Sequence, residues 1–221
     1  MKLHDRWKAR AAIIAAVVLY MLLPPKLTFG PWWIAPLLVG LLLIPVIAMA
    51  PSARFAGGKL MRAFSVALIA ILNALNVTSA VLLVVALLDT HAKNHGITAP
   101  ELLRYGGLIW ATNVIVFALW FWELDSNGPF AREKCRHARD FHIPDFLFPQ
   151  MQIDPARIHL DPNWKPDFVD YLYVSFTNAL AVSPTDTMPL SRWAKMLMLI
   201  ESLISFVTVA LILARSVNIL T

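Results

Sequence analysis

The sequence predicts an all-α integral membrane protein with about five transmembrane helices and one short re-entrant helix and loop before the last span. Two observations lead to this fold class. Hydrophobic residues make up 58% of the 221 residues and charged residues only 15%, whereas charged residues are about a quarter of an ordinary soluble domain. The apolar residues also form long runs, near the roughly 20 residues with which a helix crosses a hydrocarbon core of about 30 Å.

Each apolar run defines one expected span of a multi-pass protein of the cell inner or plasma membrane. The spans cover residues 11–23, 31–50, 64–88, 102–124 and 194–220. The first run is short and follows a basic N-terminus, as in a signal peptide. It ends at Pro24 and Pro25 instead of a small-residue cleavage site, so we expect a retained helix. Trp33 and Trp122, near the ends of two runs, are typical of the membrane interface.

The chain is expected to have three parts: a four-helix transmembrane region (1–124), a polar membrane-proximal segment (125–167) and a C-terminal module (168–221). The module begins with "FVDYLYVSFTNALAV", which is too short and too polar for a comfortable span. Polar sequence lies on both sides of it. The pattern therefore favours a helix that enters the membrane and returns, and a surface-lying amphipathic helix is the open alternative.

The module "YLYVSFTNALAVSPTDTMPLSRWAKMLMLIESLISFVTVALILARSVNIL" runs from this short helix through a bend into a long helix. It resembles the pore module of potassium channels, in which a pore helix leads into the filter T-V-G-Y-G-D, a proline and an inner helix. On this resemblance Val182 corresponds to the filter valine, Asp186 to the aspartate after the filter and Pro189 to the proline beyond it. The module is about a quarter of the chain. As a whole, the chain resembles uncharacterised bacterial multi-pass membrane proteins.

The filter-like loop departs from the potassium pattern at most of its positions. It consists of Ala181, Val182, Ser183, Pro184, Thr185 and Asp186. A potassium filter coordinates its ion with backbone carbonyls, and its glycines adopt backbone angles that other residues resist. Here the two glycine positions hold serine and threonine, and a proline fixes the backbone between them. The resemblance therefore implies a homotetramer that conducts monovalent cations without potassium selectivity.

Asp186 and Glu201 are the charged candidate site residues of the module. Four copies of Asp186 around an axis would form a carboxylate ring that concentrates cations; the alternative is a solvated or helix-capping carboxylate. Glu201 shares one helix face with Ser205 and Thr208. Ionisable residues inside membranes often have functional roles; the alternative is a buried acid that hydrogen-bonds the neighbouring re-entrant helix.

Asn73, Asn76 and Asn113 form a second set of intramembrane polar residues, in the third and fourth expected spans. Asparagines in spans commonly join helices through hydrogen bonds worth about 1 kcal/mol. We therefore interpret this set as interhelical contacts in preference to a substrate site.

The remaining sequence favours neither an enzyme nor a cofactor or metal site. The spacing of Cys135, His137, Asp140 and His142 matches no zinc pattern, and arginines intervene. No phosphate-binding loop, nucleophile elbow or pair of catalytic carboxylates is evident. The net charge is +5, and the basic residues flank the apolar runs. Anionic lipid headgroups are therefore expected partners, and nucleic acid is not.

The basic residues give an ambiguous orientation. They concentrate in the N-terminus, the 51–63 loop and the 125–167 segment, which five spans place on one side. The positive-inside rule makes that side, and the re-entrant stretch, cytoplasmic, whereas potassium channels carry their filter on the outer side. Both orientations stay open.

Three hypotheses for the function remain. The first is a poorly selective, homotetrameric pore-loop channel. The second is a non-conducting structural or partner-binding protein with a degenerate pore fold. The third is a small transporter or membrane enzyme that uses Glu201 and the asparagines of the third span.

Overall fold

The structure is a computed structural model of the chain. It describes residues 4–31, 33–34, 36–41, 59–88, 98–134, 144–153, 161, 164–181 and 186–220. This part of the chain is mainly helical, and three of its helices are long and apolar enough to cross a membrane: Lys59–Leu87, Pro100–Asn127 and Arg192–Ala214. The chain is thus a helical membrane protein. The number of five spans stays a prediction, because the helix that covers the first expected span (11–23) is not among these three and most of the second expected span (31–50) lies outside the described residues.

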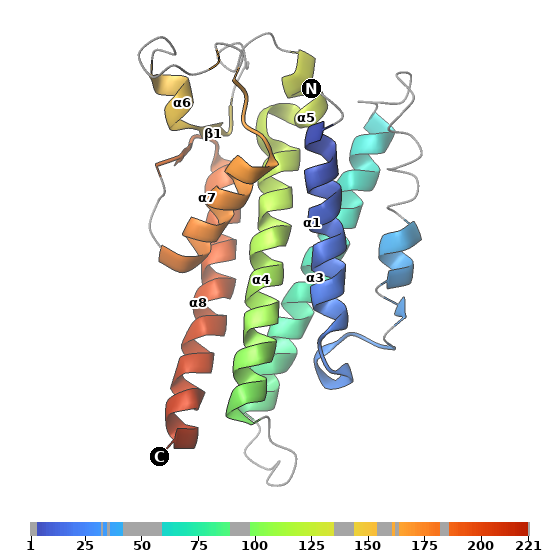
Figure 1. The fold of residues 1–221 in the computed structure, drawn as a ribbon, viewed down its shortest axis with the longest axis vertical. Helices are drawn as coiled ribbons and strands as arrows, with labels where there is room; N and C mark the ends of the chain where they lie inside the picture. Colours follow the sequence, from blue (N-terminus) through green and yellow to red (C-terminus); the bar gives the residue numbers. More distant parts are fainter. Residues whose placement is uncertain are drawn as a thin grey trace.

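Helix α4 (Ala99–Leu124) lies at the centre of the bundle (Figure 1). Around it pack α1 (His4–Met21), α3 (Lys59–Leu88), α7 (Phe168–Ala181) and α8 (Arg192–Leu220), and the short helix η1 (Pro25–Leu27) follows α1. Several helices begin a few residues before the apolar run that predicted them, because a helix continues into polar turns. The start of α4 shows why: Thr98 and Glu101 form a reciprocal capping box, which satisfies free backbone N–H groups.

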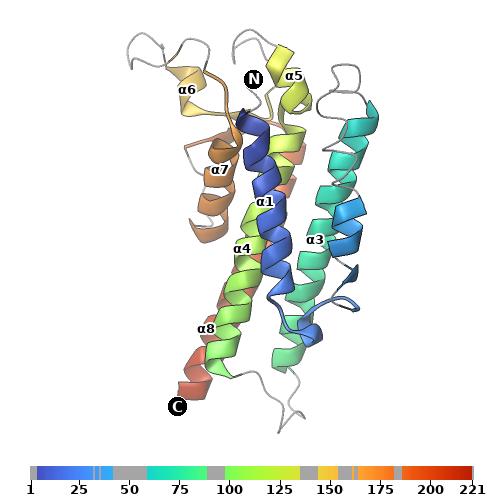
Figure 2. The same cartoon turned by 45° about the vertical axis from the view of Figure 1, so that its right-hand side comes forward.

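Helix α7 is about half the length of α4 and α8 and does not reach the far end of the bundle. It has 14 residues, against 29 in α8. Figures 1 and 2 show that α7 starts at the end of the bundle where α5 (Pro129–Lys134) and α6 (Pro149–Gln152) lie and stops part-way along α8. Helix α8 then starts from that same end, so the chain between the two helices returns to where α7 began.

A short β-ribbon holds the returning chain. Strand β1 (Phe146–Leu147) pairs antiparallel with β2 (Met188–Pro189), with Phe146 opposite Pro189 and Leu147 opposite Met188. One further backbone bond, 2.8 Å from Leu190 N to Asp145 O, extends the pairing. The predicted polar segment therefore contacts the chain on the exit side of the loop that follows α7.

Helices α4 and α8 approach each other closely at a glycine. A Cβ atom added to Gly106 would lie 2.1 Å from Ile212 Cδ1, whereas one added to Gly107 would meet nothing within 4 Å. Small residues allow close helix contacts in membrane proteins. The crossing keeps α8 against the central helix along much of its length.

Candidate functional site

The filter-like loop is only partly described. Ala181 is the last residue of α7, and Val182, Ser183, Pro184 and Thr185 lie outside the described residues. Asp186 follows them and is exposed, and Thr187 next to it is buried. The loop predicted as a filter therefore connects the tip of α7 to the exposed Asp186 and then to β2.

Glu201 in α8 joins this helix to α7. Its side chain is 0% exposed. Oε2 accepts a 2.6 Å hydrogen bond from Asn178 Nδ2, and Oε1 is hydrogen-bonded to the Ser175 hydroxyl. Ser175 and Asn178 are three residues apart in α7 and so share its inner face. Glu201 thus lies against the short helix, as expected for a buried acid that hydrogen-bonds this neighbour.

The contacts around Ser175 fit a neutral Glu201 side chain. Ser175 Oγ lies 2.7 Å from the carbonyl oxygen of Val114 and also bonds Glu201 Oε1, but a hydroxyl has only one hydrogen. A carbonyl oxygen can only accept, so with the Ser175 hydrogen on Val114 a protonated Glu201 would supply the hydrogen for its contact with Ser175, whereas an ionised Glu201 would accept the Ser175 hydrogen itself. With the neutral acid every group has a partner, and no unpaired charge is buried between the helices.

The same pair of helices shares further polar contacts around Asn178. Its Nδ2 donates to Met198 O at 3.0 Å as well as to Glu201, while its Oδ1 accepts from Ser202 Oγ at 3.1 Å. Both hydrogens and the carbonyl oxygen of the amide are therefore used. These contacts fix the C-terminal half of α7 on α8, just before the chain enters the filter-like loop.

Asn113 connects three helices at one level of the bundle. Its Nδ2 donates to Ser205 Oγ in α8 at 3.0 Å, and its Oδ1 accepts from Asn76 Nδ2 in α3 at 3.3 Å. The predicted polar residues Asn76, Asn113 and Ser205 thus meet, as interhelical contacts do. All three are buried, with at most 1% of each side chain exposed.

Thr208 and Asn73 take no part in that polar contact. Thr208 Oγ1 donates to Ile204 O, 2.7 Å away in its own helix. Asn73 Oδ1 is buried and has no hydrogen-bond partner among the described residues. The predicted polar strip of α8 therefore divides: Glu201 and Ser205 face other helices, and Thr208 bonds internally.

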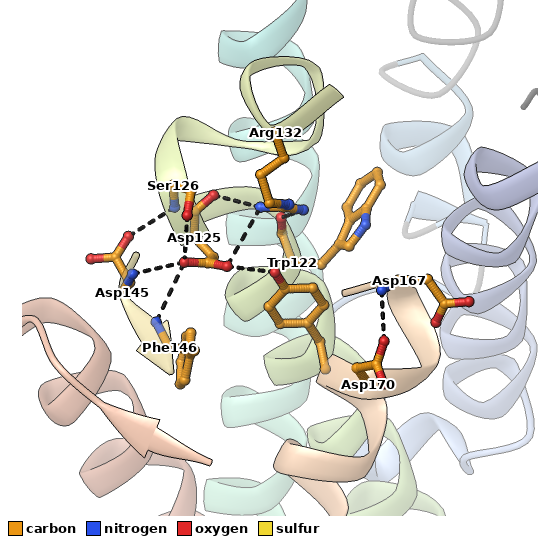
Figure 3. A network of polar contacts seen from close by, with 9 residues as sticks. Trp122, Asp125, Ser126, Arg132, Asp145, Phe146, Asp167 and Asp170 are labelled. Atoms are coloured by element: carbon orange, nitrogen blue, oxygen red, sulfur yellow. Dashed lines mark hydrogen bonds and ion pairs between the residues drawn. The ribbon is translucent and has the colours of Figure 1, made fainter. Parts of the chain in front are cut away.

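A second polar cluster lies at the end of the bundle, around Asp125 at the C-terminus of α4 (Figure 3). Its side chain is 0% exposed. Oδ1 accepts from Asp145 N at 2.8 Å and from Ser126 Oγ at 3.0 Å, and Oδ2 accepts from the Tyr171 hydroxyl at 2.5 Å. Asp125 therefore joins α4, the strand β1 and the start of α7.

Arg132 in α5 completes the cluster. Its guanidinium donates to the backbone oxygens of Asp125 at 2.5 Å and Trp122 at 2.7 Å, and it lies 4.0 Å from Asp125 Oδ2. It also stacks over the ring of Tyr171, 5.1 Å from its centroid. The free carbonyls at the C-terminus of α4 thus receive a cation, which complements the helix dipole.

The turn in "DSNGP" allows Arg132 to fold back over α4. Ser126, Asn127 and Gly128 all have positive φ, at 51°, 63° and 95°. A Cβ atom on Gly128 would lie only 3.0 Å from Glu123 O, so this position favours glycine on two counts. Reversal of the chain within three residues brings α5 over the end of α4.

The N-terminal end of α7 is attached to α1. Lys8 forms an ion pair with Asp167, and Asp167 N donates to Asp170 Oδ2 at 2.7 Å. Burial raises the pKa of Asp170, which lies in the first turn of α7 and outside the three candidate spans. The Asp167 charge also raises it, while the bond from the Asp167 backbone and the Lys8 charge lower it without reversing the direction.

Sequence reasoning did not identify Asp125, Arg132 or Tyr171 as a cluster. Asp125 and Arg132 fall in the predicted polar segment (125–167), and Tyr171 lies 46 residues after Asp125. The available signals were local: a helix ending in "LDSNGP" indicates a fixed reversal, and "PDFLFP" supplies apolar residues to cover it.

Neither a cluster of metal ligands among the described residues nor a matching relative defines the chemistry of the site. Within the described ranges, no group of three His, Cys, Asp or Glu side chains is placed to hold a metal ion. The weighed ligands Cys135, His137, Asp140 and His142 lie outside those ranges. No protein-family model matches the chain, and neither a curated protein nor a solved structure shows significant similarity to it. The resemblance to potassium channels therefore stays a prediction from the sequence.

Proposed function

We propose that α7 and the loop after it form a re-entrant pore module, and that four copies of the chain surround a cation pathway that does not select potassium. The observation that carries this proposal is the path of the chain. Helix α7 stops part-way along α8, and the chain returns to the end from which α7 started. A pore loop needs this geometry to bring its bend to mid-membrane depth.

The contacts on both sides of the loop support the proposal. Irregular backbone inside a membrane is tolerated only where protein or a water-filled cavity surrounds it. The last turns of α7 are held on α8 by Asn178, Glu201 and Ser202. On the exit side, the pairing of β2 with β1 holds the chain at the end of the bundle. The chain on each side of the loop is therefore attached to another element, α8 before the loop and β1 after it.

The outward face of the module supports the homotetramer. Exposed large apolar residues of α7 recur three or four positions apart: Val169, Tyr173, Phe176 and Leu180. Helix α8 adds a second such set: Met196, Leu199, Ile200, Leu203 and Phe206. Only 28% of the most apolar part of α8 is buried within one copy. Neighbouring copies around an axis would cover one part of this surface, and lipid would cover the rest.

Asp186 is the residue that would act on the ions. It is exposed and is the last residue of the filter-like loop. Four carboxylates at the mouth of a pathway would raise the local concentration of cations. Their effect is strongest at low salt, because the Debye length falls from about 10 Å at 0.1 M to about 3 Å at 1 M.

Planar-bilayer recording of the purified, reconstituted chain tests the proposal. Wild type should pass K⁺ and Na⁺ with similar conductance. Asp186→Asn should lower the cation conductance at 0.1 M salt about twofold or more, with a smaller loss at 1 M. Glu101→Gln is the matched control: it removes one negative charge at the opposite end of α4, and glutamine keeps the capping box. It should leave the conductance unchanged.

The alternative functions make different predictions in the same recordings. A non-conducting structural protein would give no current with any ion or voltage, and a monomer in detergent would support it further. A transporter that uses Glu201 needs access to that residue from one side of the membrane. Glu201 is fully buried between α7 and α8, so its surroundings do not favour this third function.

A further inference from the structure

A cleft lies at the end of the bundle that carries the short elements. It is formed by the first turns of α3 and α8, the last turn of α4 and strand β1, and its volume is about 410 Å³. Sites for small molecules and cofactors commonly occupy roughly 300–1,000 Å³. The apolar part of its wall comes from Phe121, Leu124, Phe146 and Leu197. None of these residues belongs to the filter-like loop.

The polar part of the cleft carries one positive and one negative side chain, Arg62 and Asp145. Asp145 is held by the Asp125 cluster: its backbone N–H donates to Asp125, and its Oδ2 accepts from Ser126 N at 3.1 Å. Its second carboxylate oxygen points away from that cluster (Figure 3). The cleft thus presents a negatively charged hydrogen-bond acceptor, which the Asp125 cluster holds in place, together with a guanidinium.

The position of the cleft matches the membrane surface. Three candidate spans have one end here, since α3 and α8 begin and α4 ends around the cleft. Trp193 also lines it and is 78% exposed, as an interfacial tryptophan is. A ligand at this depth would have a polar head in the interface and an apolar part directed into the hydrocarbon core.

We propose that this cleft binds one phospholipid whose headgroup carries a primary ammonium, with its phosphate on Arg62 and its ammonium on Asp145. Guanidinium groups bind phosphate through paired N–H donors. An ammonium supplies hydrogens to a carboxylate, and the apolar wall receives the first carbons of the chains. The two opposite charges favour a zwitterionic head over an anionic one. The site lies outside the filter-like loop, and this proposal does not depend on whether the chain conducts.

Native mass spectrometry of the full chain in detergent tests this site. The probes are phosphatidylethanolamine, phosphatidylcholine and phosphatidylglycerol with identical acyl chains. Phosphatidylethanolamine should bind about fivefold or more tightly than the other two, because only its head combines an ammonium having free N–H groups with no net charge. Asp145→Asn should remove most of this preference, since asparagine keeps the acceptor for Ser126 N–H but loses the charge.

Arg62→Gln should weaken all three phospholipids by a similar factor, because each carries a phosphate. Arg104→Gln, at the opposite end of α4, is the matched control and should change none of the affinities. Equal binding of the three lipids, or a preference that Asp145→Asn leaves intact, would overturn the proposal. Formation of a dimer that excludes lipid and depends on Arg62 would overturn it as well, because a second copy would then occupy the cleft.

Discussion

Replacement of Glu201 tests whether the hydrogen bonds of this residue hold α7 on α8. In Glu201→Leu the volume is kept, but Asn178 Nδ2 loses its 2.6 Å acceptor and Ser175 loses its second contact. A net intramolecular hydrogen bond is worth about 0.5–1.5 kcal/mol, and interhelical bonds in membranes average about 0.6 and reach about 1.7. Two lost bonds and a buried, unpaired amide hydrogen together should weaken the docking of α7 by about 2 kcal/mol.

Hydrogen exchange of peptides from α7, measured by mass spectrometry, gives the direct readout. Local opening of a helix exposes its backbone amides, so the exchange rate reports the free energy of that opening. A loss of about 2 kcal/mol corresponds to roughly 30-fold faster exchange. Glu201→Gln should change the rate less than about threefold, because glutamine donates to Ser175 and accepts from Asn178 as the neutral acid does.

Thr208→Val is the control on the same helix. Among the described residues Thr208 bonds only the backbone of α8, so loss of its hydroxyl should leave α7 exchange unchanged. The reasoning about α7 docking is refuted when Glu201→Leu and Thr208→Val give the same exchange in α7. If Glu201→Gln is as damaging as Glu201→Leu, Glu201 acts through its charge and the neutral-acid interpretation is wrong.

Two further predictions concern packing and pH. Gly106→Ala should destabilise the chain by about 1–3 kcal/mol, because the new methyl group would overlap Ile212; Gly107→Ala, with open space around it, should stabilise the helix by about 0.5–1 kcal/mol. Equal unfolding midpoints in a denaturing-detergent titration would contradict this contrast. Because the pKa of Asp170 is raised on folding, its contribution to stability is largest below the ordinary aspartate pKa and is lost as pH rises through the raised value. Asp170→Asn should therefore be neutral or stabilising at neutral pH and flatten the fall of the melting temperature as pH rises above the ordinary aspartate pKa; a lower melting temperature at neutral pH would contradict the assignment.

The helices were predictable where the apolar pattern was long. The runs behind α3, α4 and α8 each exceed 20 residues, a length that a membrane helix explains better than any other element. Helix α7 was predictable from the opposite property, since its run is too short for a span and both flanks are polar. The starts of these helices were not predictable to the residue, because polar first turns carry no hydropathy signal.

The contacts between helices were predictable only in kind. Polar residues such as Asn113 and Glu201 were expected to bond neighbouring helices, but the pairing of Glu201 with Ser175 and Asn178 depends on the rotation and depth of α7. The Asp125 cluster was harder still, because Tyr171 reaches it from an element far along the chain. A single sequence contains the residues of such a cluster but not their distances.

The most direct test of the account is the membrane side of the two flanks of α7. In a Cys135→Ser background, which removes the single native cysteine, cysteines are placed singly at Gln152, Leu190 and Phe29 and labelled with a membrane-impermeant maleimide. All three side chains are exposed; Gln152 and Leu190 flank α7, and Phe29 follows η1 beyond the C-terminal end of α1. Labelling of intact cells and of inverted vesicles should place Gln152 and Leu190 on one side and Phe29 on the other. Labelling of Gln152 and Leu190 from opposite sides would show that α7 crosses the membrane and would contradict the re-entrant module.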